Sequence, residues 1–218
     1  MCFSAEASFG ASAVLGAIGV ISLRKCSNRK HRLFAAIPIF FAFQQLSEGF
    51  VWLSFSSPGW EIYRSTFAYI FLVFALLVWP VWMPVSVWLL EPRENVKKLL
   101  AGFSVLGVLF AVLAGFFLFS HTVFPAIKDH HIHYALGFTG HLFKGASLLY
   151  FIPTVIPTLF SSRRSVNFFG FYLALSFLIS EHYFGQAVVS VWCFLAAGMS
   201  IIVLWAVLEM KKTDNTLA

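Results

Sequence analysis

Seven apolar segments dominate this chain of 218 residues, and each is close to the length that crosses a lipid bilayer. A helix needs about 20 apolar residues to span a hydrocarbon core of roughly 30 Å. Only 11% of the residues are charged, against about 25% in soluble domains. The sequence therefore predicts an all-α polytopic membrane protein with seven transmembrane helices, near Ala7–Leu23, Leu33–Phe55, Thr66–Leu89, Leu99–Phe119, Ala135–Phe160, Val166–Phe184 and Gln186–Leu208.

The basic residues predict how these helices are oriented. Twelve of the 15 lysines and arginines lie in every second loop or in the C-terminal tail, whereas only Arg64 and Lys128 lie in the other loops. Because basic loops remain in the cytoplasm, we expect the N-terminus outside and the C-terminus inside. Tyr134 is expected at the outer interface, where aromatic residues gather. A single seven-helix domain is predicted over residues 1–210, followed by a short polar cytoplasmic tail over 211–218.

The formal net charge of +6 does not indicate a nucleic-acid partner. The basic residues are spread over short loops between apolar segments, whereas nucleic acid would require a basic cluster on a folded soluble face. The three cysteines are too scattered for a disulfide framework or a paired zinc motif. The partner that the composition predicts is the lipid bilayer.

Ionisable residues inside the apolar segments form the candidate site, because a charge in hydrocarbon is costly. A helical rise of about 1.5 Å per residue places them in one layer in the outer half of the bilayer. We expect Lys144 to pair with Glu48 or Glu181, and one carboxyl to be protonated or bound to a cation. The candidate ligand-binding residues of the layer are Gln44, Gln45, Glu48, Lys144 and Glu181.

Some residues of the layer are also of the types that bind zinc or copper. The candidate metal ligands are Cys2, Glu48, His141, His182 and Cys193. If Met1 is removed, Cys2 presents a free amine beside its thiol, and it could instead form a disulfide with Cys193. The spacing of these residues matches no known metal motif. The alternative interpretation is a polar network that only holds helices together.

The loop before the fifth segment is rich in histidine. Histidine clusters bind metals and respond to pH, so His130, His131 and His133 are further candidate ligands. The alternative is an interfacial loop with solvated histidines.

Prolines lie in the cytoplasmic halves of the predicted helices, with Pro80 and Pro84, and Pro153 and Pro157, each spaced by one helical turn. Each proline removes a backbone hydrogen bond and can kink its helix. Kinks below an outer polar site would let the inner half open, as a transporter needs, although proline is also common in ordinary membrane helices.

Three stretches resemble a bacterial family of multi-pass membrane proteins of unknown function, whose members begin Met-Cys-Phe-Ser-Ala. The stretches are Met1–Ala5, Gln44–Trp52 and Ser190–Phe194. The resemblance implies a bacterial inner-membrane protein and brings no activity with it.

Three functions remain open at this point. The first is an outward-facing intramembrane site that binds or transports a metal ion such as zinc or copper, a haem, or a small cationic ligand. The second is a membrane-embedded hydrolase acting on outer-leaflet lipid, with a metal-bound water or Cys2 as nucleophile and Glu48 or Glu181 as acid and base. The third is a structural or partner-binding protein without chemistry.

Overall fold

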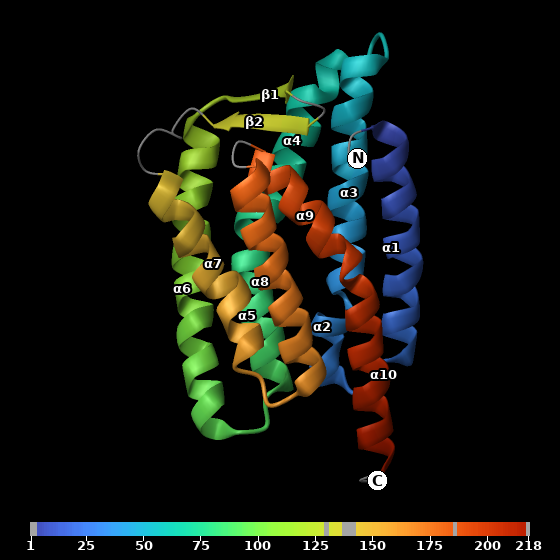
Figure 1. The fold of residues 1–218 in the computed structure, drawn as a ribbon, viewed down its shortest axis with the longest axis vertical. Coiled ribbons are helices and arrows are strands. Elements are labelled where there is room, and N and C mark those ends of the chain that lie inside the picture. The colour runs from blue at the N-terminus through green and yellow to red at the C-terminus, as the bar shows by residue number, and fades with distance from the viewer. Residues whose placement is uncertain (1–3, 129–130, 137–142, 185–186, 217–218) are drawn as a thin grey trace.

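The computed structural model describes residues 4–128, 131–136, 143–184 and 187–216, without the side chains of residues 136, 143–146 and 215–216. Most of these residues are helical, as predicted, and the helices run along the long axis of one bundle (Figure 1). The helices are α1 (Ala5–Lys25), α2 (Arg32–Ala35), α3 (Ile37–Ser56), α4 (Arg64–Leu72), α5 (Trp79–Leu90), α6 (Glu94–Ser120), α7 (Phe143–Leu159), α8 (Arg164–Phe184), α9 (Val188–Gly198) and α10 (Ser200–Thr216). Short turns η1 (Arg29–His31) and η2 (Glu61–Tyr63) precede α2 and α4.

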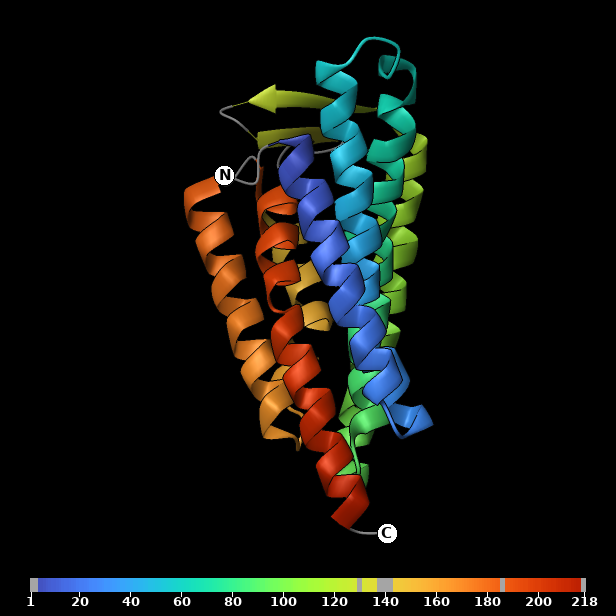
Figure 2. The same ribbon diagram turned by 90° about the vertical axis from the view of Figure 1, so that its right-hand side faces the viewer.

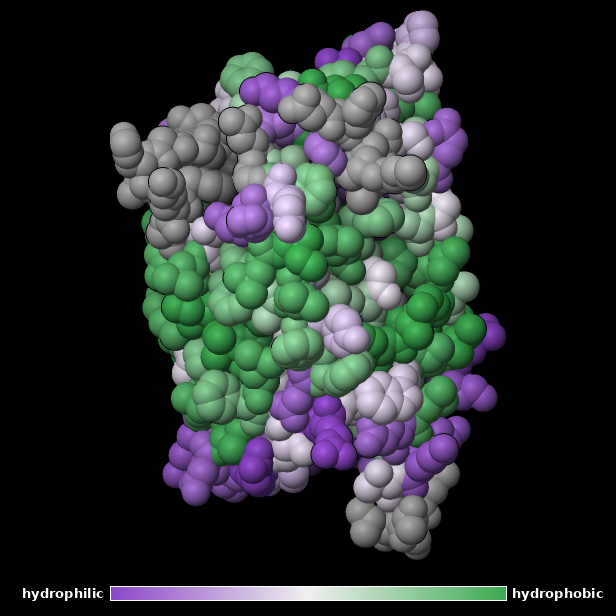
Figure 3. Space-filling view, in the orientation of Figure 1, coloured by the Kyte–Doolittle hydropathy of each residue, from purple (hydrophilic) through white to green (hydrophobic). Residues whose placement is uncertain are grey.

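Several of the helices have the length and composition of membrane spans. Within the described residues, five stretches meet both conditions, namely Ala5–Lys25, Arg29–Ser56, Glu61–Leu90, Glu94–Ser120 and Val188–Asp214, and Ser147–Leu159 is a shorter apolar helix. Apolar residues form a broad band between two polar ends on the face seen in Figure 3. These features are those of a membrane protein.

A β-hairpin replaces the start of the predicted fifth span. Strands β1 (Val123–Lys128) and β2 (His131–Leu136) pair antiparallel, with Val123 opposite Leu136 and Lys128 opposite His131. The hairpin lies across one end of the bundle (Figure 1). Ala135 therefore belongs to β2, and the helix begins at Phe143 instead. The physical reason is the period-two burial of β2, in which Ile132 and Tyr134 are buried, a pattern typical of a strand rather than a helix.

Besides the turn at Ala36 between α2 and α3, two of the long helical rods are interrupted. The first contains a π-helical segment, η3 (Val73–Val78), directly before α5. Pro80 in the first turn of α5 has no N–H to donate back along the helix, which explains the widened turns before it. The second break falls at Met199, between α9 and α10. The view in Figure 2 shows α9 and α10 following one another at an angle.

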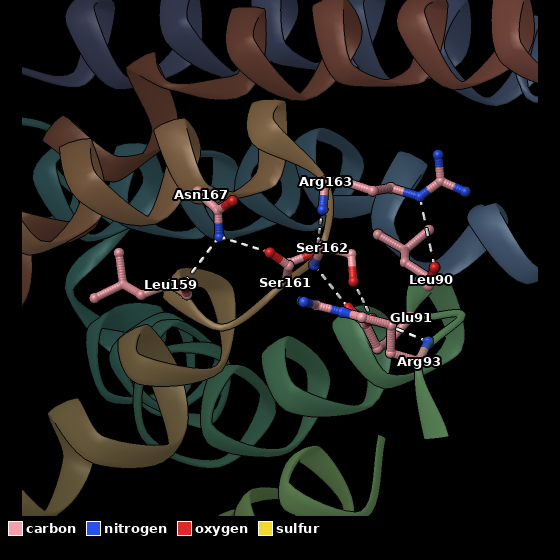
Figure 4. Close-up of polar contacts among 8 residues, drawn as sticks. All are labelled: Leu90, Glu91, Arg93, Leu159, Ser161, Ser162, Arg163 and Asn167. Carbon is pink, nitrogen blue, oxygen red and sulfur yellow. Dashed lines mark hydrogen bonds and ion pairs between the residues drawn. The ribbon is translucent and has the colours of Figure 1, made fainter. Parts of the chain in front are cut away.

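The basic end of the bundle is closed by a hydrogen-bonded junction around Glu91 (Figure 4). This carboxylate lies between α5 and α6 and accepts hydrogen bonds from the Ser162 N–H at 2.7 Å and from the Ser162 hydroxyl. It also accepts hydrogen bonds at 3.1 Å from the backbone N–H and the Nε of Arg93. Burial opposes ionisation of Glu91, but these hydrogen bonds outweigh it and hold its pKa below the usual range. The junction joins the loop after α5 to the loop after α7.

The predicted C-terminal tail is helical through most of its length. α10 continues past Lys211 and Lys212 to Thr216 and projects beyond the other helices (Figure 1). Near this end, the ring of His31 lies 3.6 Å from a carboxylate oxygen of Asp214.

Candidate functional site

The candidate site centres on Glu48, whose side chain is buried inside the helical bundle. Glu48 is only 1% exposed and lies on α3. Ser190 of α9 donates a hydrogen bond of 2.5 Å to Oε1 of Glu48, and Gln45 donates one of 3.4 Å to Oε2. One turn away on α3, the Gln44 carbonyl oxygen accepts a hydrogen bond of 2.7 Å from the indole N–H of Trp79. The carboxyl group is thus held by neutral side chains from α3 and α9, next to a polar contact with α5.

The helical spacing explains why these side chains meet. Residues 44 and 48 are one turn apart and share a face of α3, with residue 45 beside them. The same spacing places Trp52 one turn further along α3, on that face. All of these side chains are buried. The hydrogen bond from Ser190 links this face directly to α9.

Several buried polar atoms around Glu48 make no hydrogen bond in the described structure. They are Nε2 of Gln44, Oε1 of Gln45, Nε1 of Trp52 and the hydroxyl of Tyr134. Tyr134, from β2, packs face to face on Phe71 with ring centroids 5.0 Å apart and lies within electrostatic range of Glu48. Buried polar groups usually have partners, because leaving one unpaired costs about 1–3 kcal/mol. The site therefore has unused hydrogen-bonding capacity.

A small cavity adjoins this group of residues. Its volume is about 10 Å³, and its wall includes Trp79, Cys193 and the buried hydroxyl-bearing residue Thr154 of α7. That space is close to what one water molecule needs. Cys193 connects the two regions, because its thiol lies beside Gln44 and within electrostatic range of Glu48. Trp79 connects them as well, since its N–H donates to Gln44 while its ring lines the cavity.

The structure brings together some of the residues that the sequence places in one layer and separates others. Gln44, Gln45, Glu48 and Cys193 gather as expected, and all are buried. Glu181 and His182 do not join them, because both lie exposed at the end of α8. The predicted depth of these two residues is not tested, but their side chains are turned away from the interior of the bundle.

Other predicted residues fall outside what the structure describes. Three of them, Cys2, His130 and His141, lie outside the described residues. The metal site that uses Cys2 and His141 therefore remains an untested prediction, and so does the disulfide between Cys2 and Cys193. Lys144 lies in the first turn of α7, but its side chain is not described. The predicted pairing of Lys144 with a carboxyl likewise remains a prediction.

The remaining histidines of the outer loop lie on the hairpin. His131 and His133 are both half-buried on β2 and alternate with buried residues, so they share one face of the strand. The pKa of His133 is lowered mainly by burial and to a smaller extent by the positive charge of Lys128. Among the residues that the structure describes, no three His, Cys, Asp or Glu side chains are grouped closely enough to hold a metal ion.

Three residues of the site were not selected as candidates from the sequence. Ser190 and Trp79 supply hydrogen bonds within the cluster, and Tyr134, expected at the interface, is buried near Glu48. A serine or tryptophan inside an apolar segment is too common to single out. The alternation of histidine with Ile132 and Tyr134 did carry a signal, because it predicts a strand that buries Tyr134.

A comparison with protein families identifies the chain. The model of a family of unknown function, DUF6629, matches residues 1–217, so the chain belongs to this family. No curated protein and no solved structure matches it. The family relationship expected from the sequence is confirmed, and the function has to be argued from the site.

Proposed function

We propose that this member of the DUF6629 family is a seven-span membrane protein whose Glu48 site binds a small cation that enters from the outer side. The observation that carries the proposal is the setting of Glu48: the carboxyl is buried among neutral hydrogen-bonding groups, and no cationic side chain pairs with it among those the structure describes. A lone carboxylate inside a membrane is costly, so Glu48 carries a proton when the site is empty and exchanges it for a cation.

The neutral residues around Glu48 support binding of a small ion rather than a metal cofactor. The hydrogen-bonding capacity left on Gln44, Gln45 and Tyr134 is oxygen and amide chemistry, which suits a monovalent cation or its water. The described residues offer no cluster of metal-binding side chains. The adjoining cavity of about 10 Å³ favours a water-sized ligand over haem.

The orientation follows from the distribution of charge. The basic loops lie at the end of the bundle that holds the Glu91 junction, and the hairpin lies at the opposite end (Figure 1). With the basic end in the cytoplasm, the N-terminus and the hairpin end are outside. In this proposal the cation reaches the buried Glu48 from that side. The two helix interruptions, at η3 and at Met199, are in the rods that supply Trp79 and Ser190. Interrupted helices of this kind form ion sites in membrane transporters.

Proton release tests the proposal directly. We expect sodium, potassium or ammonium chloride, added to unbuffered purified protein with a pH-sensitive dye, to release about one proton per protein molecule. Tetrabutylammonium chloride controls for ionic strength, because its cation is far larger than the cavity. The variant Glu48→Gln should release no proton, whereas Glu209→Gln, which changes an exposed glutamate on α10, should behave as the wild type.

Two results would contradict the proposal. Equal release from Glu48→Gln would place the exchanging proton elsewhere. Absence of release with all three salts would mean that Glu48 is already ionised, as it would be if Lys144 neutralised it, or that no cation binds.

The proposed orientation has its own test. Ile62 at the hairpin end and Asn95 at the basic end are both exposed. In intact cells, and with the native Cys2, Cys26 and Cys193 replaced by serine, a membrane-impermeant maleimide should label Ile62→Cys and should label Asn95→Cys only after the membrane is opened. The reverse pattern would overturn the outward-facing site.

A further inference from the structure

Four of the nine residues that line the cavity next to the Glu48 site are aromatic. Phe41 stacks on Trp79 with centroids 4.2 Å apart, and Tyr150 meets Trp192 edge to face at 5.4 Å. All four residues line the cavity. Aromatic faces carry a partial negative charge, and a cation near them is stabilised most by tryptophan and more strongly when it is shielded from water.

The polar edges of both tryptophans are already engaged elsewhere. The Trp79 N–H donates to Gln44, and the Trp192 N–H donates to the Ser176 hydroxyl at 3.1 Å and to the Leu173 carbonyl oxygen at 3.3 Å. These hydrogen bonds fix the indole rings in place. The parts of these rings that remain free to contact a ligand in the cavity are the ring carbons and their π surface.

One buried hydroxyl in the cavity wall has no partner. Thr154 is 3% exposed, and its Oγ1 lies near Tyr150 without a hydrogen bond of normal geometry. Its neighbour one turn along α7, Thr158, is equally buried but donates a hydrogen bond of 2.5 Å to the Val155 carbonyl oxygen. Thr154 therefore provides an acceptor to whatever fills the cavity, and Thr158 does not.

We infer that this cavity is a binding site for the ammonium ion, held by cation–π attraction to Trp79 and Trp192 and by a hydrogen bond to Thr154 Oγ1. This inference rests on the proposed cation site and names its ligand. Ammonium is close in size to water and donates hydrogen bonds, so it can use a single hydroxyl acceptor and the weaker Cys193 sulfur. Potassium is similar in size, but protein sites for it supply several carbonyl oxygens, whereas most residues that line this cavity have aromatic or aliphatic side chains. The charge of the ion is balanced by Glu48, which lies within electrostatic range of Cys193.

The test measures the melting temperature of the purified protein in matched concentrations of ammonium, potassium, sodium and tetramethylammonium chloride. Ammonium is expected to raise the melting temperature by at least about 3 °C relative to the other three salts. Thr154→Val, which keeps the shape but removes the acceptor, should lose this difference, and Thr154→Ser should retain it. Thr158→Val is the matched control on the same helix: its baseline melting temperature is expected to fall, but the ammonium effect should remain.

The outcomes separate this inference from the proposed function. Equal shifts of the melting temperature in ammonium, potassium and sodium chloride would overturn the ammonium site but leave the proposed role of Glu48 unchanged. This is the result expected from a cavity that holds only water. An ammonium effect that survives in Thr154→Val would also overturn it. An ammonium effect that Thr154→Val abolishes, without proton release from Glu48, would support the ammonium site and count against the proposed exchange at Glu48.

Discussion

Two glutamates are buried in this bundle, and their surroundings differ sharply. Glu91, at the basic end, is 3% exposed and accepts four hydrogen bonds, one of them from the Arg93 guanidinium. Glu48, within α3, is 1% exposed and accepts hydrogen bonds only from the neutral Ser190 and Gln45 among the described residues. Both are joined to a serine of a distant helix or loop, so the difference lies in charge compensation.

This difference separates a structural carboxylate from a candidate functional one. Glu91 is ionised and saturated, and its partners tie the α5–α6 loop to the α7–α8 loop. Glu48 has neighbours with unused hydrogen-bonding atoms and a cavity beside them. Stability is expected to depend on the first, and ligand binding on the second.

The largest effect is expected from Glu91→Ala. It leaves the Ser162 and Arg93 donors without their acceptor, which costs about 2–3 kcal/mol because hydrogen bonds to a charged group are the strong ones. Thermal unfolding in detergent should show a clearly lowered melting temperature. A melting temperature equal to that of the wild type would mean that the junction does not stabilise the fold.

The two serines provide a matched pair. Ser162→Ala removes a hydrogen bond to an ionised carboxylate and should cost about 1.5–3 kcal/mol. Ser190→Ala removes one to a carboxyl that we expect to be neutral and should cost about 0.5–1.5 kcal/mol. Melting temperatures of the two variants measure the comparison. A larger loss of stability in Ser190→Ala than in Ser162→Ala would indicate that Glu48, rather than Glu91, is the ionised glutamate.

The pH dependence of stability should follow Glu91. Burial raises the pKa of Glu91, but its hydrogen bonds outweigh burial and hold the folded pKa below the ordinary value for glutamate. The stability that its ionised form contributes is therefore fully present above that ordinary value and is lost as the pH falls through the lower folded pKa. Melting temperatures between pH 6 and pH 3 should decrease less in Glu91→Gln than in the wild type. Identical slopes would assign the acid sensitivity to other groups.

The smallest effect on stability is expected from Glu48→Gln. Glutamine has nearly the same shape and keeps both the donor and acceptor roles of a protonated carboxyl, so the change should stay within about 1 kcal/mol. The same substitution should abolish cation-linked proton release. A large loss of stability together with intact proton release would reverse the roles assigned to the two glutamates.

The helical part of the fold follows from the sequence because apolar length predicts a membrane helix directly. The start of α7 does not, since Ala135 and Leu136 are apolar enough to join a span but belong to β2. Only the alternation of Ile132 and Tyr134 with histidines just before them indicates a strand. The π segment before Pro80 follows from the backbone N–H that proline lacks. Whether a helix answers this loss with a kink, a break or a π segment is decided by packing, which the sequence does not show.

The site was only partly predictable for a related reason. Helical spacing places Gln44, Gln45 and Glu48 together, since they share one helix and one face. Depth along a helix does not determine which way a side chain points relative to other helices, which is why Glu181 is exposed instead of joining Glu48. Ser190 and Trp79 come from distant segments and are recognised only from tertiary contacts.

The most direct measurement of the central claim is infrared difference spectroscopy of the purified protein at neutral pH, with and without ammonium chloride. A protonated carboxyl has a carbonyl stretch separate from that of a carboxylate. We expect the wild type to show this band, to lose it when the salt is added, and to lack it entirely in Glu48→Gln. A band that is absent from the wild type without added salt, or that persists in Glu48→Gln, would contradict the claim that Glu48 holds a proton in exchange for a cation.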